Sequence, residues 1–488
     1  MSGLSLWLVI LGALLTAGCT VGPKYHQPSA PVTPAYKEPP PDSFKGSDQW
    51  KTAKPMADAV RGNWWEIFQD SQLNALEERV TPGNLTLKAA EARFRQARAL
   101  VKYNRSALFP TISVAPSILS LRDSPNGPYF PGSALRIGFT GEFLLPFDLS
   151  YEVDLWGRIR RTVAAVGEEA QATAADLETV SLSLHTELAM DYFELRAADA
   201  QIKLLDATVH AYGELLQLTS DLFHGGASPE TDVVQAHTQL DTARVQYTDV
   251  FEFRAQYEHA IAVLIGKPPA QFSLPPSPLE SAPPAIPVGL PSQLLERRPD
   301  IAANERRVAE ANEQIGIARA AYFPTLTLSA AGGFEGSNIR NWLNWPSRFW
   351  AVGPTMTEIL FDAGRRRANS EAARASYDDM VATYRQSVLS AFQEVEDNLA
   401  ALRVLEKEAQ QQNGAVGQAK RAVQLFTYLY EGGADPYLDV VTAQTTELLN
   451  ERNAIDILRR RMDVTVLLIK GLGGGWDASK LPPISSFH

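Results

Sequence analysis

The sequence has almost no cysteine, no run of basic residues and few histidines. Cys19 is the only cysteine among 488 residues, which excludes an intramolecular disulfide and a cysteine-based metal site. Seven scattered histidines without an HExxH pattern give metal catalysis no basis, so we expect neither a metal nor a cofactor. A net charge of −11 argues against nucleic acid as a partner.

The common catalytic motifs are also missing. The chain has no GxSxG, no GxxxxGK[ST] phosphate loop and no GxGxxG in a βαβ setting. The glycine-rich stretch 471–475 follows a predicted helix rather than a strand, and we interpret it as a helix end and a flexible exit. The sequence therefore predicts a protein that is not an enzyme.

The N-terminal apolar run is too short to cross a bilayer as a helix. Leu4–Ala17 has 14 residues, against about 20 for a span, and fits the core of a signal peptide over residues 1–18. Eight prolines between positions 22 and 55 predict an extended tether over residues 19–60. A short helix over 64–79 is expected to dock it.

A joint between a helix and a strand occurs twice. Residues 300–321 have the spacing of an amphipathic helix, and after Pro324 the apolar residues recur at every second position. The same change follows Pro110, so the Phe-Pro-Thr sequences at 109 and 323 stand 214 positions apart. The chain is therefore predicted to be a tandem duplication.

Long alternating segments predict strands that cross a membrane. Residues 137–155 alternate apolar and polar side chains over 19 positions, whereas a membrane strand needs about 9 to 11. Three further strands are expected over 111–121, 325–334 and 349–361, with the register of the last least defined because of Glu358. Four strands cannot close a barrel, which has about eight or more, so a dimer, trimer or tetramer must share one.

The rest of the chain reads as long helical hairpins. Apolar steps of three and four residues run from about 158 to 222 and predict a helix of about 97 Å. A turn at 224–229 leads to a return helix ending near 265, and residues 366–429 and 437–470 repeat the arrangement. The predicted units are 61–274 with hairpin 111–155, a proline-rich linker 275–291, 292–471 with hairpin 325–361, and a tail 472–488.

Five stretches in order resemble one protein family. They are CTVGPKYHQP, WWEIFQDSQLNAL, ERRPDI followed by IGIARAAYFPTL, LFDAGRRR, and YEGGADPYLDVVTAQ. The chain resembles the TolC-like outer-membrane factors, in particular the lipoprotein branch of NodT type found in efflux systems. The resemblance implies an α+β membrane protein: a trimeric, 12-stranded outer-membrane β-barrel, four strands per chain, continued by a long periplasmic barrel of coiled-coil helices.

The same resemblance implies a lipid anchor and partners. The sequence LLTAGCT resembles a lipoprotein signal, so Cys19 is expected to be lipidated and the protein to sit in the outer membrane of a Gram-negative bacterium. The uncharged MSGLS start and Thr16 depart from the usual signal. The expected partners are a homotrimer, outer-membrane lipid, a periplasmic adaptor and an inner-membrane pump of the resistance-nodulation-division type.

The hairpin tips are the expected functional site. The turns at Gly225-Gly226 and Gly432-Gly433 are expected to dock the adaptor, although tight turns also need glycine for positive φ. In the resembling family, acidic rings and a tyrosine close the entrance, which assigns Asp439 and Tyr430 to the gate. Asp435 is a second gate candidate and also suits a helix start. A ring of carboxylates at a constriction would favour cations.

Two classes of function remain open at this point. The first is a passive duct that exports small toxic compounds, either drugs or metal ions, with polypeptide (type I) secretion as its variant. The second is a structural lipoprotein that bridges periplasmic layers through coiled coils. The 19-residue alternation of the second strand favours the duct, because a bridging protein does not need it.

Overall fold

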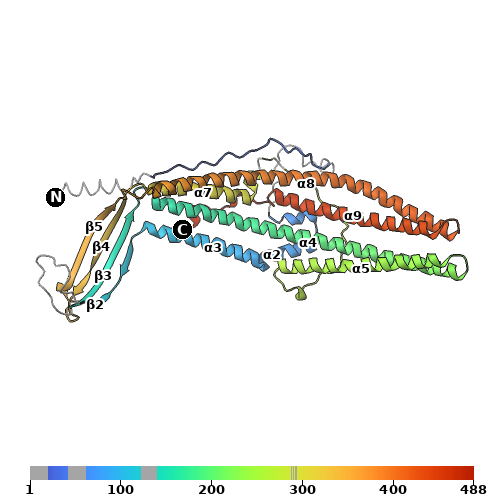
Figure 1. Cartoon of the computed structure of the whole chain (residues 1–488), viewed down its shortest axis with the longest axis horizontal. Helices are drawn as coiled ribbons and strands as arrows, with labels where there is room; N and C mark the ends of the chain where they lie inside the picture. The colour runs from blue at the N-terminus through green and yellow to red at the C-terminus, as the bar shows by residue number, and fades with distance from the viewer. Residues whose placement is uncertain are drawn as a thin grey trace.

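The computed structural model describes residues 20–41, 62–121, 140–286, 288, 291 and 294–487. The predicted signal peptide, Cys19 and the tether beyond residue 41 lie outside the described residues. The molecule is elongated, with a β-sheet at one end and long parallel helices forming the remainder (Figure 1).

The sheet contains five strand segments: β1 (Thr111–Val114), β2 (Ser117–Leu121), β3 (Thr140–Val153), β4 (Thr325–Gly336) and β5 (Arg348–Thr357). β3 pairs with β1 and β2 on one side and with β4 on the other, and β5 pairs with β4, all antiparallel. The two halves of the chain therefore meet in the centre of one sheet. Among the described residues, the edges formed by β1–β2 and by β5 have no strand partner.

The predicted strands are correct in position, with two differences at their limits. The first strand is divided, because Pro116 has no N–H to donate to the ladder, although the register with β3 continues unchanged on both sides of it. The fourth strand ends at Thr357, so Glu358 lies outside the sheet, where its carboxylate is 3.5 Å from Arg366 Nη1. The register of this fourth strand with β4 places Val352 opposite Ala330.

Alternation along the strands produces one apolar face. Val114, Phe147, Gly332 and Trp350 form one row across the sheet, and the three large side chains of this row are more than half exposed. One neighbouring row, on the opposite face, consists of the small or polar residues Ser113, Asp148, Ala331 and Ala351. A continuous apolar face that is left exposed is the pattern of a sheet that meets lipid.

Each half contains one long helix and two shorter ones in line beside it. In the first half these are α4 (Arg158–His224), α3 (Leu85–Arg105) and α5 (Glu230–Leu264). In the second half they are α8 (Arg365–Glu431), α7 (Pro299–Ala320) and α9 (Tyr437–Gly471). α4 and α8 both have 67 residues, about 100 Å. Within the described chain, no helix is long and apolar enough to cross a membrane.

The joint between sheet and helices links the two halves. Trp156, which follows β3, stacks on Phe323 at 4.6 Å between ring centroids, and its Nε1 donates to the carbonyl of Pro324 at 2.8 Å. Gly157 and Gly364 precede the two long helices with φ of 79° and 90°. These left-handed residues allow the sharp change of direction from strand to helix.

The predicted helix over 64–79 is wrong in its limits. A short 3-10 helix, Trp64–Phe68, is followed by Gln69 in the left-handed region and then by α2 (Ser71–Gly83). The helix is interrupted there because the Asp70 side chain caps α2. Its carboxylate accepts hydrogen bonds from the backbone N–H groups of Gln72 and Leu73. A four-residue helix, α6 (Leu294–Arg297), also precedes α7.

The described part of the tether lies along the helices of the second half (Figure 1). Tyr25 donates to the carboxylate of Glu305, and the backbone N–H groups of Lys37 and Glu38 donate to Glu396 at 2.7 and 2.9 Å. These contacts fix the tether to α7 and α8.

The glycine stretch 471–475 closes the end of α9, as predicted, with the N–H of Gly474 donating to the carbonyl of Ile469 at 3.0 Å. The exit is packed rather than flexible, because Gly473 is buried and the tail beyond it is docked on the helices. Trp476 packs beside Ala302 and Ala303, and Phe487 is buried against Val101 and Ala170. The tail therefore connects the end of α9 to α7 and then to the α3–α4 layer.

A buried acid–base pair lies where α2 meets α4. Glu77 Oε2 is 2.6 Å from His185 Nδ1, both residues are buried, and Trp65 stacks on the imidazole at 4.6 Å. Burial raises the pKa of Glu77 to about 9 and lowers the pKa of His185 to about 4. Both groups are therefore neutral at pH 7, since burial disfavours each charged form.

Candidate functional site

Both hairpin turns lie at the end of the molecule farthest from the sheet (Figure 1). The first joins α4 to α5 through residues 225–229, and the second joins α8 to α9 through residues 432–436. The long helices carry these turns about 100 Å from the strand ends. The predicted tips are thus brought together, although about 200 positions separate them in the chain.

The two turns have the same hydrogen bonds. The N–H of Ala227 donates to the carbonyl of Leu222 at 2.8 Å, and that of Ala434 donates to Leu429 at 2.8 Å. This six-residue return is the Schellman closure, which places one residue in the left-handed region. In each turn it satisfies carbonyls that the helix end would otherwise leave free.

Only the second glycine of each pair needs positive φ. Gly226 and Gly433 have φ of 77° and 70°, whereas Gly225 and Gly432 remain in the right-handed helical region at −77° and −78°. The expectation that all four glycines serve a positive φ is therefore wrong for Gly225 and Gly432. A Cβ at Gly226 or Gly433 would meet no atom within 4 Å, so both sites are open.

A small apolar cluster joins the two hairpins just above the tips. Tyr430 and Tyr437 lie with ring centroids 5.2 Å apart, and they pack with Val440, Leu215 and Ala236 from both hairpins. Burial raises the pKa of Tyr437, so its hydroxyl stays neutral at physiological pH. This cluster fixes the second turn against the first.

The Tyr430 hydroxyl reaches the first turn directly. It lies 3.4 Å from Ser228 Oγ, and Ser228 Oγ donates to Asp232 Oδ2 at 2.7 Å. The sequence predicted Tyr430 but gave no partner for it, because the partners lie about 200 positions away. The contact is a polar link between the two tips.

The two predicted gate carboxylates have different positions. Asp439 lies in the first turn of α9, where the positive end of the helix dipole favours an anion. Asp435 does not cap this helix, since Pro436 occupies the cap position without a side-chain bond, which corrects the helix-start interpretation of Asp435. Among the described residues, neither carboxylate has a hydrogen-bond or ion-pair partner, and both are partly exposed.

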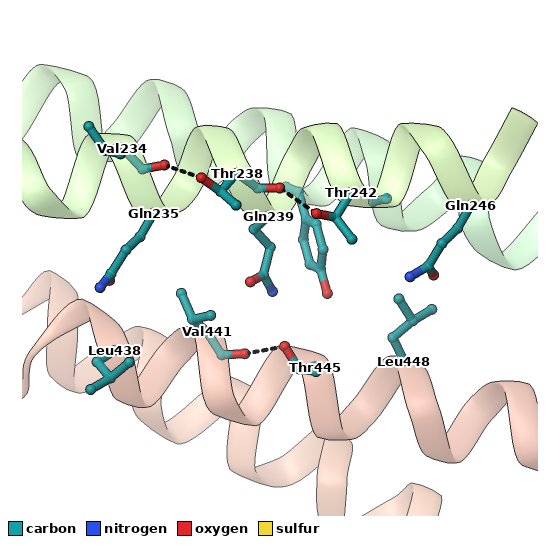
Figure 2. Close-up of a pocket in the computed structure, with 12 residues that line it drawn as sticks. Val234, Gln235, Thr238, Gln239, Thr242, Gln246, Leu438, Val441, Thr445 and Leu448 are labelled. Carbon is teal, nitrogen blue, oxygen red and sulfur yellow. Dashed lines mark hydrogen bonds between the residues drawn. The ribbon is translucent and has the colours of Figure 1, made fainter.

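A groove lies between α5 and α9 near the tips. Its volume is about 330 Å³, and Figure 2 shows side chains from both helices pointing toward it. Thr238, Thr242 and Thr445 donate their hydroxyls to carbonyls one turn earlier in their own helices. The groove therefore presents the methyl groups of these threonines. Its other lining residues supply one aromatic ring, aliphatic side chains and glutamine amides: Tyr212, Val234, Gln235, Gln239, Ala243, Gln246, Leu438, Val441 and Leu448. None of its lining residues is charged.

The described residues offer no group of three or more His, Cys, Asp or Glu side chains placed to hold a metal ion. The chemistry of the tips is thus that of a contact surface, with hydroxyl, amide and carboxylate groups around an apolar cluster.

The sequence profile of the outer membrane efflux protein family matches residues 78–267 and 290–474. The chain belongs to this family. The solvent efflux pump outer membrane protein SrpC of Pseudomonas putida is 32% identical over 479 residues, covering 97% of this chain and 99% of the relative. OprJ of Pseudomonas aeruginosa, an outer membrane protein, is 29% identical and covers 96% of each chain.

Solved structures agree with this outer membrane efflux protein fold. The outer-membrane channel OprN superimposes with a TM-score of 0.83 at 29% identity, covering 94% of this chain and 100% of that one. The CmeC channel of Campylobacter jejuni has a TM-score of 0.84 at 24% identity, covering 96% and 97%, and supports the fold.

These comparisons confirm the family resemblance, the α+β channel fold and the outer-membrane location. The protein is an outer-membrane component of an efflux system and not an enzyme. The bridging-lipoprotein alternative is therefore set aside.

Proposed function

We propose that three copies of this outer membrane efflux protein form a passive duct for small toxic compounds, drugs or metal ions, from periplasm to exterior. The four strands of one chain leave two open edges among the described residues, and lipid does not tolerate open edges. Three chains would supply a 12-stranded barrel. Relatives named for solvent, toluene and antibiotic efflux support a small-molecule cargo.

The duct is opened at its tips by a periplasmic adaptor and an inner-membrane pump of the resistance-nodulation-division type. The observation that carries this proposal is the pair of matched, solvent-exposed turns at the end opposite the sheet (Figure 1). Gly225, Gly226, Gly432 and Gly433 would form the docking tips, with open space beside Gly226 and Gly433 for a partner's backbone. The neighbouring α5–α9 groove, of about 330 Å³, has no charged lining residue and would receive apolar side chains of a partner helix.

Tyr430 is the proposed latch of the entrance. Its contact with Ser228 joins the second tip to the first, so breaking it frees the second hairpin to move. Asp439 and Asp435 would form negative rings in a trimer and favour cations at the constriction. The measurement is planar-bilayer conductance: Tyr430→Phe should open more often than the wild type, while Tyr428→Phe, at an exposed tyrosine two residues earlier on α8, should not.

Cys19 is the proposed site of lipidation, which would hold the N-terminus at the inner face of the outer membrane. Metabolic labelling with a clickable palmitate analogue tests this assignment. The wild type should carry label and Cys19→Ser should not, with both proteins found in the membrane fraction. Equal labelling of the two proteins contradicts the assignment.

The deciding experiment is in-cell photocrosslinking from positions 226 and 433, followed by identification of the trapped protein. A photoreactive residue at exposed position 367, in the first turn of α8 and near the sheet, is the matched control. Capture of a periplasmic adaptor at the tips and not at 367 supports docking. Capture of an adaptor that belongs to a polypeptide exporter would favour secretion instead. If the protein is folded in the outer membrane and traps nothing at either tip, tip docking is contradicted.

A further inference from the structure

A single arginine joins the two hairpins in the middle of the helical body. Arg459 on α9 forms ion pairs with Glu194 on α4 and, at 3.0 Å, with Asp463 on its own helix, both through Nη1. Arg459 Nη2 also lies 2.8 Å from Asp456. Two carboxylates from different helices thus converge on one guanidinium nitrogen, which places them close to each other.

Asp463 is the unusual member of this group. It is only 8% exposed, and its buried Oδ1 has no hydrogen-bond partner within the part of the chain that the structure describes. An ionised carboxylate normally accepts several hydrogen bonds, so an unpaired buried oxygen is costly unless the group is protonated. A proton on Asp463 would remove its charge and would provide a donor toward Glu194.

The surrounding charges are mostly negative. α4 contributes Glu187, Asp191 and Glu194, α5 contributes Tyr257, α8 contributes Glu408, and α9 contributes Asp456, Arg459, Arg460 and Asp463. Five carboxylates on α4 and α9 therefore face two arginines. The paired tip glycines Gly225 and Gly432 stand 207 positions apart, and the same offset relates Glu194 to Ala401 and Asp463 to Gln256. The fold itself therefore does not require this arrangement.

We propose that Asp463 and Glu194 form a proton-dependent link between the two hairpins, closed when the pair holds a proton and weakened when it does not. The consequence for channel opening rests on the proposed function, because the hairpin that carries Arg459 and Asp463 also carries the Tyr430 tip. The link itself is a property of the folded chain and can be tested without transport.

The direction of the effect follows from the two states of Asp463. Burial, and then the charge of Glu194, raise the pKa of Asp463 to about 7 from 3.8, while Arg459 opposes the shift. Burial likewise raises the pKa of Asp191 to about 7, with help from Glu187 and Glu194. A packed state with a raised pKa binds the proton more tightly than an open one, so packing weakens as pH rises through 7.

The size of the effect is set by one proton. If opening returns Asp463 to its ordinary pKa, the ratio of open to closed α4–α9 contact increases about tenfold between pH 6 and pH 8. The comparison is made within one protein, so contributions that do not titrate cancel.

The experiment is amide hydrogen exchange of α9 in the detergent-solubilised wild-type protein at pH 6 and pH 8. Rates are corrected for intrinsic pH dependence with an unfolded peptide of the same sequence. Protection of residues 456–466 should fall about tenfold in the wild type. The drop should be clearly smaller in Asp463→Asn, which keeps the neutral shape of the protonated acid and leaves Asp191 to titrate. The control Asp241→Asn, at a 67% exposed site paired with Arg244, should keep the wild-type drop.

A second variant covers the case in which Asp463→Asn fails to fold. Glu194→Gln removes the charge that helps to raise the pKa of Asp463, so the drop in protection should move to lower pH. No pH-dependent drop in the wild type, or the same drop in Asp463→Asn, would overturn the proposal. Loss of efflux or of adaptor capture would contradict the proposed function without altering these exchange results.

Discussion

Replacing Gly433 by alanine tests whether backbone conformation defines the tip. Gly433 has φ of 70° and open space around its missing Cβ, so the only cost is the left-handed conformation. That cost is about 1–2 kcal/mol for a residue with a Cβ. The change should therefore destabilise the second turn without creating a clash.

Gly432 provides a matched control on the neighbouring residue. It has φ of −78°, and an added Cβ would lie at ordinary contact distances of 3.5 and 3.6 Å from two carbonyl oxygens. Gly432→Ala should be neutral or should stabilise the turn by about 0.4–1 kcal/mol through the unfolded state. Both positions are exposed and adjacent, so they differ mainly in φ.

Hydrogen exchange at the tip measures the difference, because local opening dominates there. A cost of 1–2 kcal/mol corresponds to protection of the Ala434 amide reduced by about 5- to 30-fold in Gly433→Ala. Gly432→Ala should leave that protection unchanged or higher. Equal effects of the two substitutions would refute the argument from φ.

Three further predictions concern other parts of the chain. Val352→Arg on the apolar face should cost about 2–4 kcal/mol near the bilayer centre and reduce folding into liposomes, while Ala351→Arg on the opposite face should be tolerated. Glu77 gains its proton on folding, so stability should fall as pH rises from 6.5 to 9, by on the order of 3 kcal/mol. Below pH 6.5 the pH dependence from Glu77 is cancelled by His185, which gains a proton on unfolding while Glu77 loses one. In urea unfolding, Glu77→Gln should not lose stability between pH 6.5 and 9. Asn84→Ala removes the hydrogen bond that caps the backbone N–H of Leu87 and the hydrogen bond to the carbonyl of Leu264 at the end of α5. The free energy of unfolding should fall by about 1–3 kcal/mol, measured by urea unfolding.

Local patterns account for the elements that the sequence predicted. The alternation of apolar and polar residues located the strands, and steps of three and four located helices that end within a few residues of the prediction. The failures occurred where one residue overrides a pattern. Pro116 divides a strand, and Asp70 restarts a helix, because each alters backbone hydrogen bonding rather than hydrophobicity.

The candidate site was predicted only in part. Glycine pairs mark tight turns in any sequence, so the tips could be located, but φ decides which glycine is required and no sequence pattern states it. The tip carboxylates were placed by resemblance, whereas the α5–α9 groove is formed by residues of two hairpins that lie about 200 positions apart in the chain.

The sequence by itself determined the duplication, the lengths of the hairpins and the need for more than one chain to close the sheet. Those properties depend on residue spacing, which is fixed along the chain. The tertiary structure decided which distant side chains meet: Glu77 with His185, Ser228 with Tyr430, and Glu194 with Arg459. Their partners lie 108 to 265 positions apart, and only the packing of one helix against another brings such groups within hydrogen-bond distance and removes the water that would otherwise weaken them.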